Sequence, residues 1–339
     1  MNESVRSHAV PPNLANHGYY YRTCAKDLVL AYKTLRSRDS LLPLIINTPG
    51  SLHSTYTSIL TELLAHFKPH HVVHLSDTQA IDTEQAEKLD AIQTIMSQYR
   101  GTLHEITSLA PAMPPMRSDA EFREMQMQSY FHLKKLSTGE ASPTSWNFDP
   151  LSTLAPWEFC FEETAERTQD FVGFAMYSEP IEPASLVHAL NGSIVHIVES
   201  TSSAIPPLLP RTKRYRIPFF EKSDRTGMVE PLDPKTSKVV CTALIRGFEP
   251  ERRVVQVLVP KIHEGLLYGM VPERTVFVSG CCDAPEWAYV EDAYAGVSGE
   301  AGEVSGSDEV VHAPWVDDVD RMDDMGYLNT VRRVRKFQT

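Results

Sequence analysis

The chain has 339 residues, of which 42% are hydrophobic and 22% are charged. This composition is sufficient for one or two domains with ordinary cores and excludes a disordered chain. The longest apolar runs, such as LLPLII at 41–46, are far shorter than the ~20 residues that a membrane-spanning helix needs, so we expect no membrane segment.

The net charge of −12 is concentrated in one segment. Residues 283–324 contain thirteen Asp or Glu and one basic residue, Arg321, so this segment carries −12 and the rest of the chain sums to zero. Such a Gly- and Ser-interrupted acidic segment is typical of a solvated loop, with docking onto a basic partner as the alternative.

The N-terminus lacks the apolar core of a secretory signal, and the five cysteines include no C-x-x-C pair. We therefore expect reduced thiols in a cytoplasmic or nuclear protein.

The first 110 residues alternate helical and strand patterns. We predict helices at about 22–37, 56–67 and 83–99, and strands at 44–46, 72–75 and 102–106. The run at 44–46 is continuously apolar, which is typical of a strand buried on both faces. Because this alternation favours parallel pairing, residues 20–110 are predicted to form half of a three-layer α/β sheet.

The remainder of the chain is predicted to be richer in strands. Residues 116–132 begin with a capping box, Ser118-x-x-Glu121, and indicate a further helix. We assign 1–136 to a first domain, 137–158 to a linker or insertion, and 159–339 to a β-rich domain. In that domain we predict strands at 194–198, 239–245, 254–259 and 275–279, a hairpin between the second and third of these, and short helices at 184–190 and 263–269.

Polar residues follow the predicted strand at 44–46. In open α/β sheets ligands bind outside the carboxyl ends of the strands, so Asn47, Thr48 and Gly50 lie where a substrate is expected. A simple turn at Pro49-Gly50 is the alternative, because Pro and Gly are ordinary loop residues.

Three histidines lie near the predicted strand at 72–75, but we predict no metal site there. On a strand, His70 and His74 would be ~13 Å apart on one side and His71 would point to the other, whereas zinc ligands converge at ~2 Å. A serine-hydrolase site is not supported either, because the chain has no G-x-S-x-G motif.

Three segments carry a resemblance to a known family: PLIINTPG at 43–50, MRSDAEFREMQMQSYFH at 116–132 and TALIRGFEPERRVVQVLVP at 242–260. In this order they resemble the nucleolar polynucleotide 5′-hydroxyl kinases, from about residue 19 to the end. The resemblance implies an α/β fold, with a partial P-loop-type parallel sheet followed by a β-rich C-terminal domain. It also implies transfer of the ATP γ-phosphate to an RNA 5′-hydroxyl in ribosomal RNA processing, with ATP and Mg²⁺ as cofactors, in the nucleus and nucleolus beside an endoribonuclease.

The resemblance implies a polynucleotide-binding role for Asn47, Thr48 and Gly50. Ser51 stands where the family has Trp, and base stacking on an aromatic is worth ~1–3 kcal/mol. We therefore expect weaker RNA binding unless His53 or Tyr56 takes the place of that Trp.

Basic residues provide the other candidate contacts. By resemblance, Arg117 and Arg123 match paired lid arginines that stabilise the transferring phosphoryl group; ion pairs on a solvated helix face are the alternative. The run PRTKRYRIPFFEKSDR at 210–225 offers Arg214 and Arg216 as further RNA contacts, with a plain surface loop as the alternative. The C-terminal run VRRVRKF at 331–337 is, by resemblance, a tail that docks on the endoribonuclease.

The motif that would hold ATP is absent from the sequence. None of the 16 glycines is followed by Lys, so no G-x-x-x-x-G-K-[ST] loop occurs and the cofactor-binding residues stay unknown. Two interpretations follow: a C-terminal part of an RNA kinase whose P-loop lies upstream, or a noncatalytic module that binds RNA or the nuclease. In either case we expect the isolated chain to be inactive, and its half-sheet to aggregate or require a partner.

Overall fold

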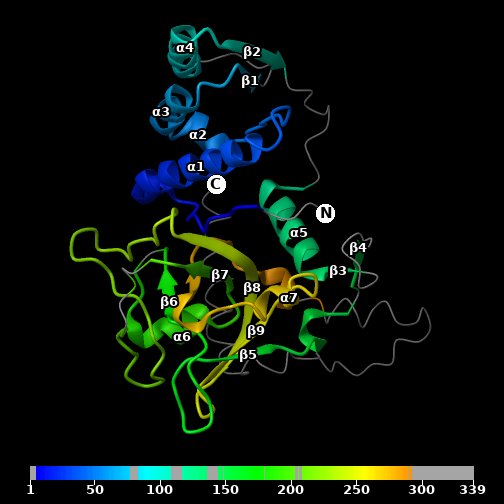
Figure 1. Ribbon diagram of the computed structural model, residues 1–339, viewed down its shortest axis with the longest axis vertical. Helices are drawn as coiled ribbons and strands as arrows, with labels where there is room; N and C mark the ends of the chain where they lie inside the picture. Colours follow the sequence, from blue (N-terminus) through cyan, green and yellow to red (C-terminus); the bar gives the residue numbers. More distant parts are fainter. Residues whose placement is uncertain are drawn as a thin grey trace, which may run out of the picture. The chain divides into compact units, whose positions relative to one another are not determined.

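The computed structural model describes residues 5–76, 83–107, 117–135, 144–147, 149–178, 180–202, 205, 208–289 and 291. The chain divides into two compact units. Figure 1 labels their helices and strands. The N-terminal unit contains Asn2–Ser118 and Pro231–Lys238, and the C-terminal unit contains Asp119–Glu230 and Val239–Thr339. The helix at Asp119–His132 therefore groups with the C-terminal unit, whereas the sequence-based boundary placed it in the first domain.

The N-terminal unit combines helices with a parallel strand pair. Its elements are α1 (Leu14–Arg36), α2 (Gly50–Ser54), α3 (Thr57–Phe67), β1 (His71–Ser76), α4 (Thr83–Gln98) and β2 (Thr102–Thr107). β1 and β2 pair in parallel from His71 opposite Thr102 to Ser76 opposite Thr107. The predictions for α3, α4, both strands and their parallel pairing are confirmed, whereas α1 begins at Leu14, where the side chain of Asn13 accepts a hydrogen bond from the amide of Ala15.

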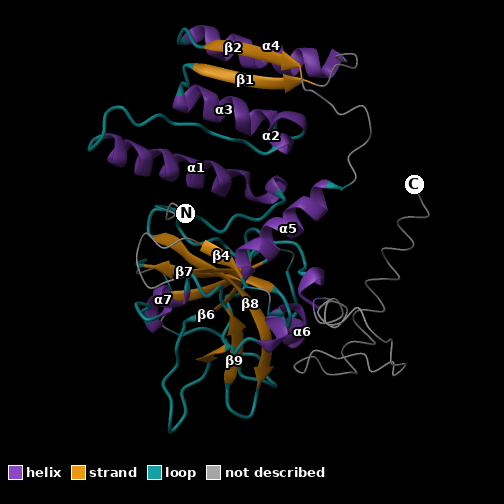
Figure 2. Cartoon of the chain, turned by 90° about the vertical axis from the view of Figure 1, so that its right-hand side faces the viewer, coloured by secondary structure: helices purple, strands orange, loops and turns teal. Residues whose placement is uncertain are grey.

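Helices α3 and α4 cover one face of the β1–β2 pair, and no described helix of this unit covers the other face (Figure 2). Val72 and Leu103 pack against a cluster from α3 and α4 that includes Leu64, Ile92 and Met96. Because side chains alternate along a strand, the next residues point to the opposite face. There Val73, Leu75 and Ile106 are 55%, 67% and 50% exposed. We call this surface the bare face.

The prediction of a buried strand at 44–46 is wrong. Residues 42–49 have no regular secondary structure, and Ile45 is 89% exposed. A strand of a parallel sheet needs neighbours that pair with its backbone and cover its side chains. In the described part of the N-terminal unit the sheet consists of β1 and β2 alone, so the apolar pattern of this segment has no neighbouring strand.

The C-terminal unit is built on a six-stranded sheet in the order β5-β9-β8-β7-β10-β6. The strands of this sheet are β5 (Trp157–Cys160), β6 (Gly173–Met176), β7 (Ile194–Ser200), β8 (Ser237–Glu249), β9 (Val254–Leu258) and β10 (Thr275–Ser279). Two further strands, β3 (Leu133–Lys135) and β4 (Thr144–Trp146), form a separate antiparallel pair. The helices of the unit are α5 (Asp119–His132), η1 (Leu151–Thr153), η2 (Pro183–Ser185), α6 (Leu186–Leu190), α7 (Glu264–Leu267), η3 (Pro272–Arg274) and η4 (Glu286–Tyr289).

Most of the predicted elements of this unit are confirmed. β7, β8, β9, β10, α6 and α7 lie where they were predicted, and β8 and β9 form the predicted antiparallel hairpin. β5 and β6 were not predicted, because four residues are too few to show a period. The mixed α/β fold class, with a parallel pair followed by a strand-rich unit, is confirmed.

Aromatic packing fills the core of the C-terminal unit. All five residues of β10 are buried, and the ring of Phe277 stacks on Phe171 at 4.4 Å between centroids. Phe159 and Phe174 meet Phe277 edge to face. This burial on both faces explains why the three central residues of the strand, 276–278, are all apolar. Among the helices that the structure describes, none has both the length and the apolar character needed to cross a bilayer.

Candidate nucleic-acid interface

The polynucleotide-binding residues predicted at 47–50 lie on an exposed segment of the N-terminal unit. Asn47 and Thr48 belong to the irregular stretch before α2, and Gly50 is the first residue of that helix. All three are exposed. A Cβ at Gly50 would meet nothing within 4 Å and no positive φ is recorded there, so the fold itself does not require glycine at this position.

Helix α2 is fixed to the unit directly behind these residues. The side chain of Leu52 is fully buried in a cluster with Leu14, Ile59 and Leu63. At the other end of α2, Nζ of Lys88 donates a hydrogen bond of 2.6 Å to the carbonyl oxygen of Ser54. The exposed groups at 47–50 therefore adjoin a short, anchored helix.

Two aromatic side chains follow Ser51 closely in the chain, His53 and Tyr56, and both make contacts within the unit. The ring of His53 lies 4.7 Å from that of His74 on β1, and its Nε2 is buried without a partner in the structure. Burial, followed by the proximity of His74 and Lys88, lowers the pKa of His53. Tyr56 packs in the cluster around Leu52, with its hydroxyl 3.5 Å from Oδ1 of Asn13. Both rings are thus engaged within the unit and are poorly placed for stacking on a base.

The two predicted lid arginines belong to different units. Arg117 is exposed and lies in the N-terminal unit, and Arg123 lies on α5 of the C-terminal unit. Nε of Arg123 is 3.1 Å from a carboxylate oxygen of Asp283, with both side chains about three-fifths exposed. Such an exposed pair is weak, so the guanidinium can exchange Asp283 for another anion at small cost.

The C-terminal half of α5 is built into the C-terminal unit. The hydroxyl of Tyr130 donates to the carbonyl oxygen of Thr242 on β8 and accepts from the amide of the same residue. Burial is the main cause that raises the pKa of Tyr130. Phe131 is buried against Trp287, with ring centroids 5.8 Å apart. The C-terminal end of α5 therefore anchors this helix to the rest of the C-terminal unit.

A buried His–Glu pair ends this helix. Nε2 of His132 lies 2.6 Å from a carboxylate oxygen of Glu291, and its Nδ1 lies 2.7 Å from the carbonyl oxygen of Asn147. Burial lowers the pKa of His132, but the hydrogen bond and the charge of Glu291 outweigh burial, so the pKa is raised above its ordinary value. The other oxygen of Glu291 accepts from the amide of Leu151. Sequence reasoning missed this pair, because 159 residues separate its members.

The basic run at 210–225 is largely occupied by structural contacts. Arg211 donates to the carbonyl oxygens of Phe161 and Arg216. Arg216, a predicted RNA contact, pairs with Glu162 at 3.1 Å. The guanidinium of Arg214 lies over the ring of Tyr215, 4.9 Å from its centroid. Among the described residues, Arg216 pairs with a carboxylate and Arg214 does not.

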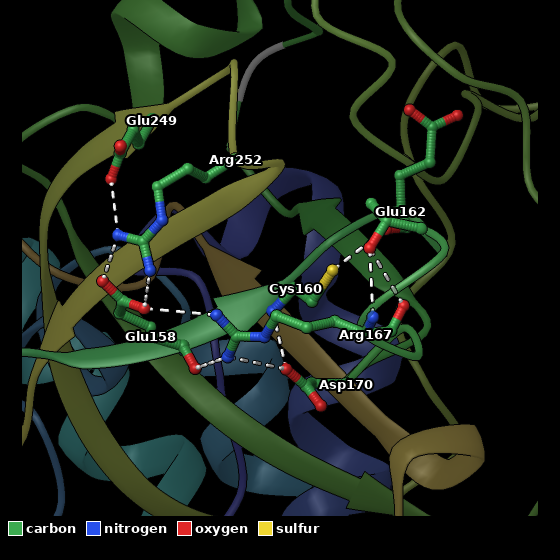
Figure 3. A network of polar contacts seen from close by, with 8 residues as sticks. Glu158, Cys160, Glu162, Arg167, Asp170, Glu249 and Arg252 are labelled. Atoms are coloured by element: carbon green, nitrogen blue, oxygen red, sulfur yellow. Dashed lines mark hydrogen bonds and ion pairs between the residues drawn. The ribbon is translucent and has the colours of Figure 1, made fainter.

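A second polar network, drawn in Figure 3, joins β5 to the turn after β8. Arg252 reaches both carboxylate oxygens of Glu158 at 2.8 Å and also contacts Glu249. The hydrogen bonds from Arg252 and Arg167 lower the pKa of Glu158. Within this network each guanidinium pairs with a carboxylate. Such pairing is typical of a structural ion-pair cluster at the edge of a sheet.

Two predicted features lie outside the described residues. These are the basic tail at 331–337 and most of the acidic segment at 283–324. Among the residues that the structure does describe, no group of three or more His, Cys, Asp or Glu side chains converges as a metal site.

Comparison with known proteins identifies relatives that cover both units. Polynucleotide 5′-hydroxyl-kinase GRC3 of Gibberella zeae is 28% identical over 93% of this chain and 43% of its own length. The proteins of that name from Aspergillus niger and Emericella nidulans are each 26% identical, over 87% and 81% of this chain. A scan against models of protein families finds no match.

These relatives confirm the resemblance to the polynucleotide 5′-hydroxyl kinases that the sequence motifs indicated. The chain spans about two fifths of the length of the curated relatives that it matches, with 43%, 40% and 37% covered in these three.

Proposed function

We propose that this chain supplies the polynucleotide-binding part of an RNA 5′-hydroxyl kinase and does not transfer phosphate on its own. The observation that supports the proposal is the combination of similarity to these kinases over 93% of the chain with the absence of a G-x-x-x-x-G-K-[ST] motif. Catalysis of phosphoryl transfer depends on positioning and charge stabilisation of the phosphates, which that loop supplies in P-loop enzymes.

The exposed segment at 47–50 is the proposed contact with the polynucleotide. Asn47 and Thr48 present polar side chains to solvent next to the anchored helix α2. Gly50, which the fold does not require, leaves room for a sugar–phosphate backbone to approach the main chain. Arg123, whose partner Asp283 is exposed, is the proposed cation for the phosphoryl group from the C-terminal unit, and Arg117 is its proposed counterpart.

ATP and Mg²⁺ are the cofactors of the proposed reaction, but the residues of this chain do not fit them. The sequence lacks the glycine-rich loop and its Lys, and the described residues hold no converging cluster of carboxylates for Mg²⁺. We therefore derive no catalytic step through ATP. Ribosomal RNA as substrate, nucleolar location and an endoribonuclease that binds the basic tail are further proposals that depend on the kinase relationship.

A noncatalytic RNA- or nuclease-binding module is the second candidate function. It is favoured by Ser51, because a chain that retained catalysis would be expected to retain the aromatic base contact, and the contacts of His53 and Tyr56 within the unit support the loss of that contact.

The test combines an activity assay with a binding assay on the purified chain. We expect no transfer of radiolabel from Mg-ATP to a 5′-hydroxyl RNA, together with measurable binding of that RNA by fluorescence anisotropy. Substituting both Asn47→Ala and Thr48→Ala should weaken binding about thirtyfold, since two lost hydrogen bonds at ~1 kcal/mol each cost ~2 kcal/mol and ~1.4 kcal/mol is a factor of ten. Thr94→Ala, on the exposed side of α4, is the matched control.

The two assays separate the parts of the proposal. Strong labelling by the purified chain would contradict its inactivity. Equal RNA affinity of the double variant and the control would contradict the role of 47–50. A complete lack of RNA binding would exclude an RNA-binding function for the isolated chain. The sequence similarity to the kinases does not depend on this result.

A further inference from the structure

Two histidines from neighbouring strands meet on the bare face of the N-terminal unit. Nδ1 of His71 on β1 lies 3.1 Å from Nε2 of His104 on β2. The ring centroids are 5.3 Å apart and the rings are tilted by 41°. Both residues are exposed to solvent.

The parallel register produces this meeting. His71 is opposite Thr102 and Val73 is opposite His104, so the two histidines are diagonal neighbours that point to the same face. The sequence argument against a metal site considered His70, His71 and His74 along one strand, and those three do not converge. The partner of His71 comes from the next strand, which spacing along one strand cannot show.

The separation of the two nitrogens matches that of adjacent ligands on a transition metal. Metal–nitrogen bonds of ~2.0–2.1 Å place two neighbouring imidazole nitrogens ~2.9–3.4 Å apart, depending on whether the site is square or tetrahedral. A hydrogen bond between the rings has the same length, but in it only one proton is shared. Metal binding requires both facing nitrogens to be deprotonated, with the remaining proton of each ring on its other nitrogen.

We propose that His71 and His104 form a two-histidine chelate for a divalent transition-metal cation of the Zn²⁺, Ni²⁺ and Cu²⁺ class. Imidazole nitrogen suits these ions, whereas Mg²⁺ and Ca²⁺ require oxygen ligands. Within the described chain no third His, Cys, Asp or Glu completes the group, so water occupies the other coordination positions. The proposal does not depend on the kinase relationship.

Backbone and surroundings favour this pair over the other histidines. The parallel ladder from His71 to Ser76 fixes both strands, so the pair is held in place before a metal arrives. His53 and His74 also lie close together, at 4.7 Å between centroids, but burial and nearby Lys88 oppose a cation there. His70 directly precedes β1 and provides a matched control.

Titration of the full chain with Ni²⁺, followed by calorimetry, tests the proposal. We expect one equivalent to bind and the affinity to fall at least tenfold in His71→Gln and in His104→Gln, while His70→Gln retains the affinity. Because protons compete with the metal for imidazole nitrogen, affinity should also fall on acidification from pH 7.5 to about pH 5.5.

A second readout keeps the test independent of folding. Substoichiometric Cu²⁺ should selectively broaden the ring NMR signals of His71 and His104, and far-UV circular dichroism should show that both variants remain folded. Unchanged affinity in both variants, or loss of binding in Cys281→Ser or Cys282→Ser instead, would overturn the proposal. An equal loss of metal affinity in His70→Gln would also overturn the proposal. Binding would then not depend on the two histidines that the strand register brings together.

Discussion

The two units bury their strands to very different extents. In the C-terminal unit, β10 lies between β7 and β6 and all five of its residues are buried. In the described part of the N-terminal unit, the pair β1–β2 is covered by helices on one face only, and Leu75 on the other face is 67% exposed. Similar apolar strand sequences therefore have different consequences. A strand contributes to a core only where neighbouring strands and a second layer are present.

The largest expected effect is the loss of an aromatic side chain from the larger core. Phe277→Ala removes a fully buried ring that contacts Phe159, Phe171 and Phe174, and should lower the free energy of unfolding by ~3–5 kcal/mol. Val73→Ala on the bare face should cost less than ~0.5 kcal/mol. The two stretches of the N-terminal unit contain no Trp, so urea unfolding followed by Trp fluorescence reports on the C-terminal unit, and circular dichroism reports on both. An equal decrease in the free energy of unfolding for the two substitutions would contradict the difference in strand burial between the units.

The buried pair at the end of α5 should give the next largest effect, and one that depends on pH. The pKa of His132 is raised in the folded state, so its contribution is fully present below the ordinary pKa of ~6.5 and is lost as pH rises through the folded value. Glu291→Gln should therefore reduce stability by ~1.5–3 kcal/mol at pH 6 and by less at pH 9. Urea midpoints at both pH values measure this difference. A loss of unfolding free energy in Glu291→Gln that is the same at both pH values would show that His132 and Glu291 do not form a charged pair.

The bare face should affect association more than stability. We expect the chain to self-associate with increasing concentration, and Leu75→Lys to reduce this association in sedimentation velocity while leaving the free energy of unfolding within ~0.5 kcal/mol. Leu266→Lys, at a residue that is 47% exposed in the C-terminal unit, is the control. A wild-type chain that stays monomeric and melts cooperatively would contradict the expectation of an unpartnered sheet.

The smallest effect is expected at the network in Figure 3. In Arg252→Ala, Glu158 keeps its contact with Arg167, so the unfolding midpoint should not change measurably. A clear decrease would mean that the edge strand β5 depends on this ion pair more than exposed pairs usually allow.

Sequence periodicity predicted where helices and strands lie better than it predicted which strands pair with one another. The stripe at 56–67 gave α3 almost to the residue, and the runs at 72–75 and 102–106 gave a parallel pair. The equally apolar run at 44–46 did not become a strand, because pairing depends on segments elsewhere in the sheet and periodicity contains no information about them.

The candidate site was predictable only in part, for the same reason. Asn47, Thr48 and Gly50 were expected at the carboxyl end of a strand at 44–46, and that strand is absent; helix α2, which begins at Gly50, was not predicted. The engagement of Arg216 by Glu162, of Arg123 by Asp283 and of His71 by His104 joins residues far apart in sequence. A basic run in a sequence therefore shows where cations lie but not which of them are already neutralised.

The assignment of Pro231–Lys238 to the N-terminal unit has a practical consequence. Arg6 bonds both to Asp27 on α1 and to the carbonyl oxygen of Pro234, so this short stretch belongs with the first unit although the second unit surrounds it in sequence. Over the described residues, the chain passes between the units after Ser118, after Glu230 and after Lys238. No single cleavage therefore separates two intact folding units, because a cut after Ser118 leaves Pro231–Lys238 on the fragment that carries the other unit.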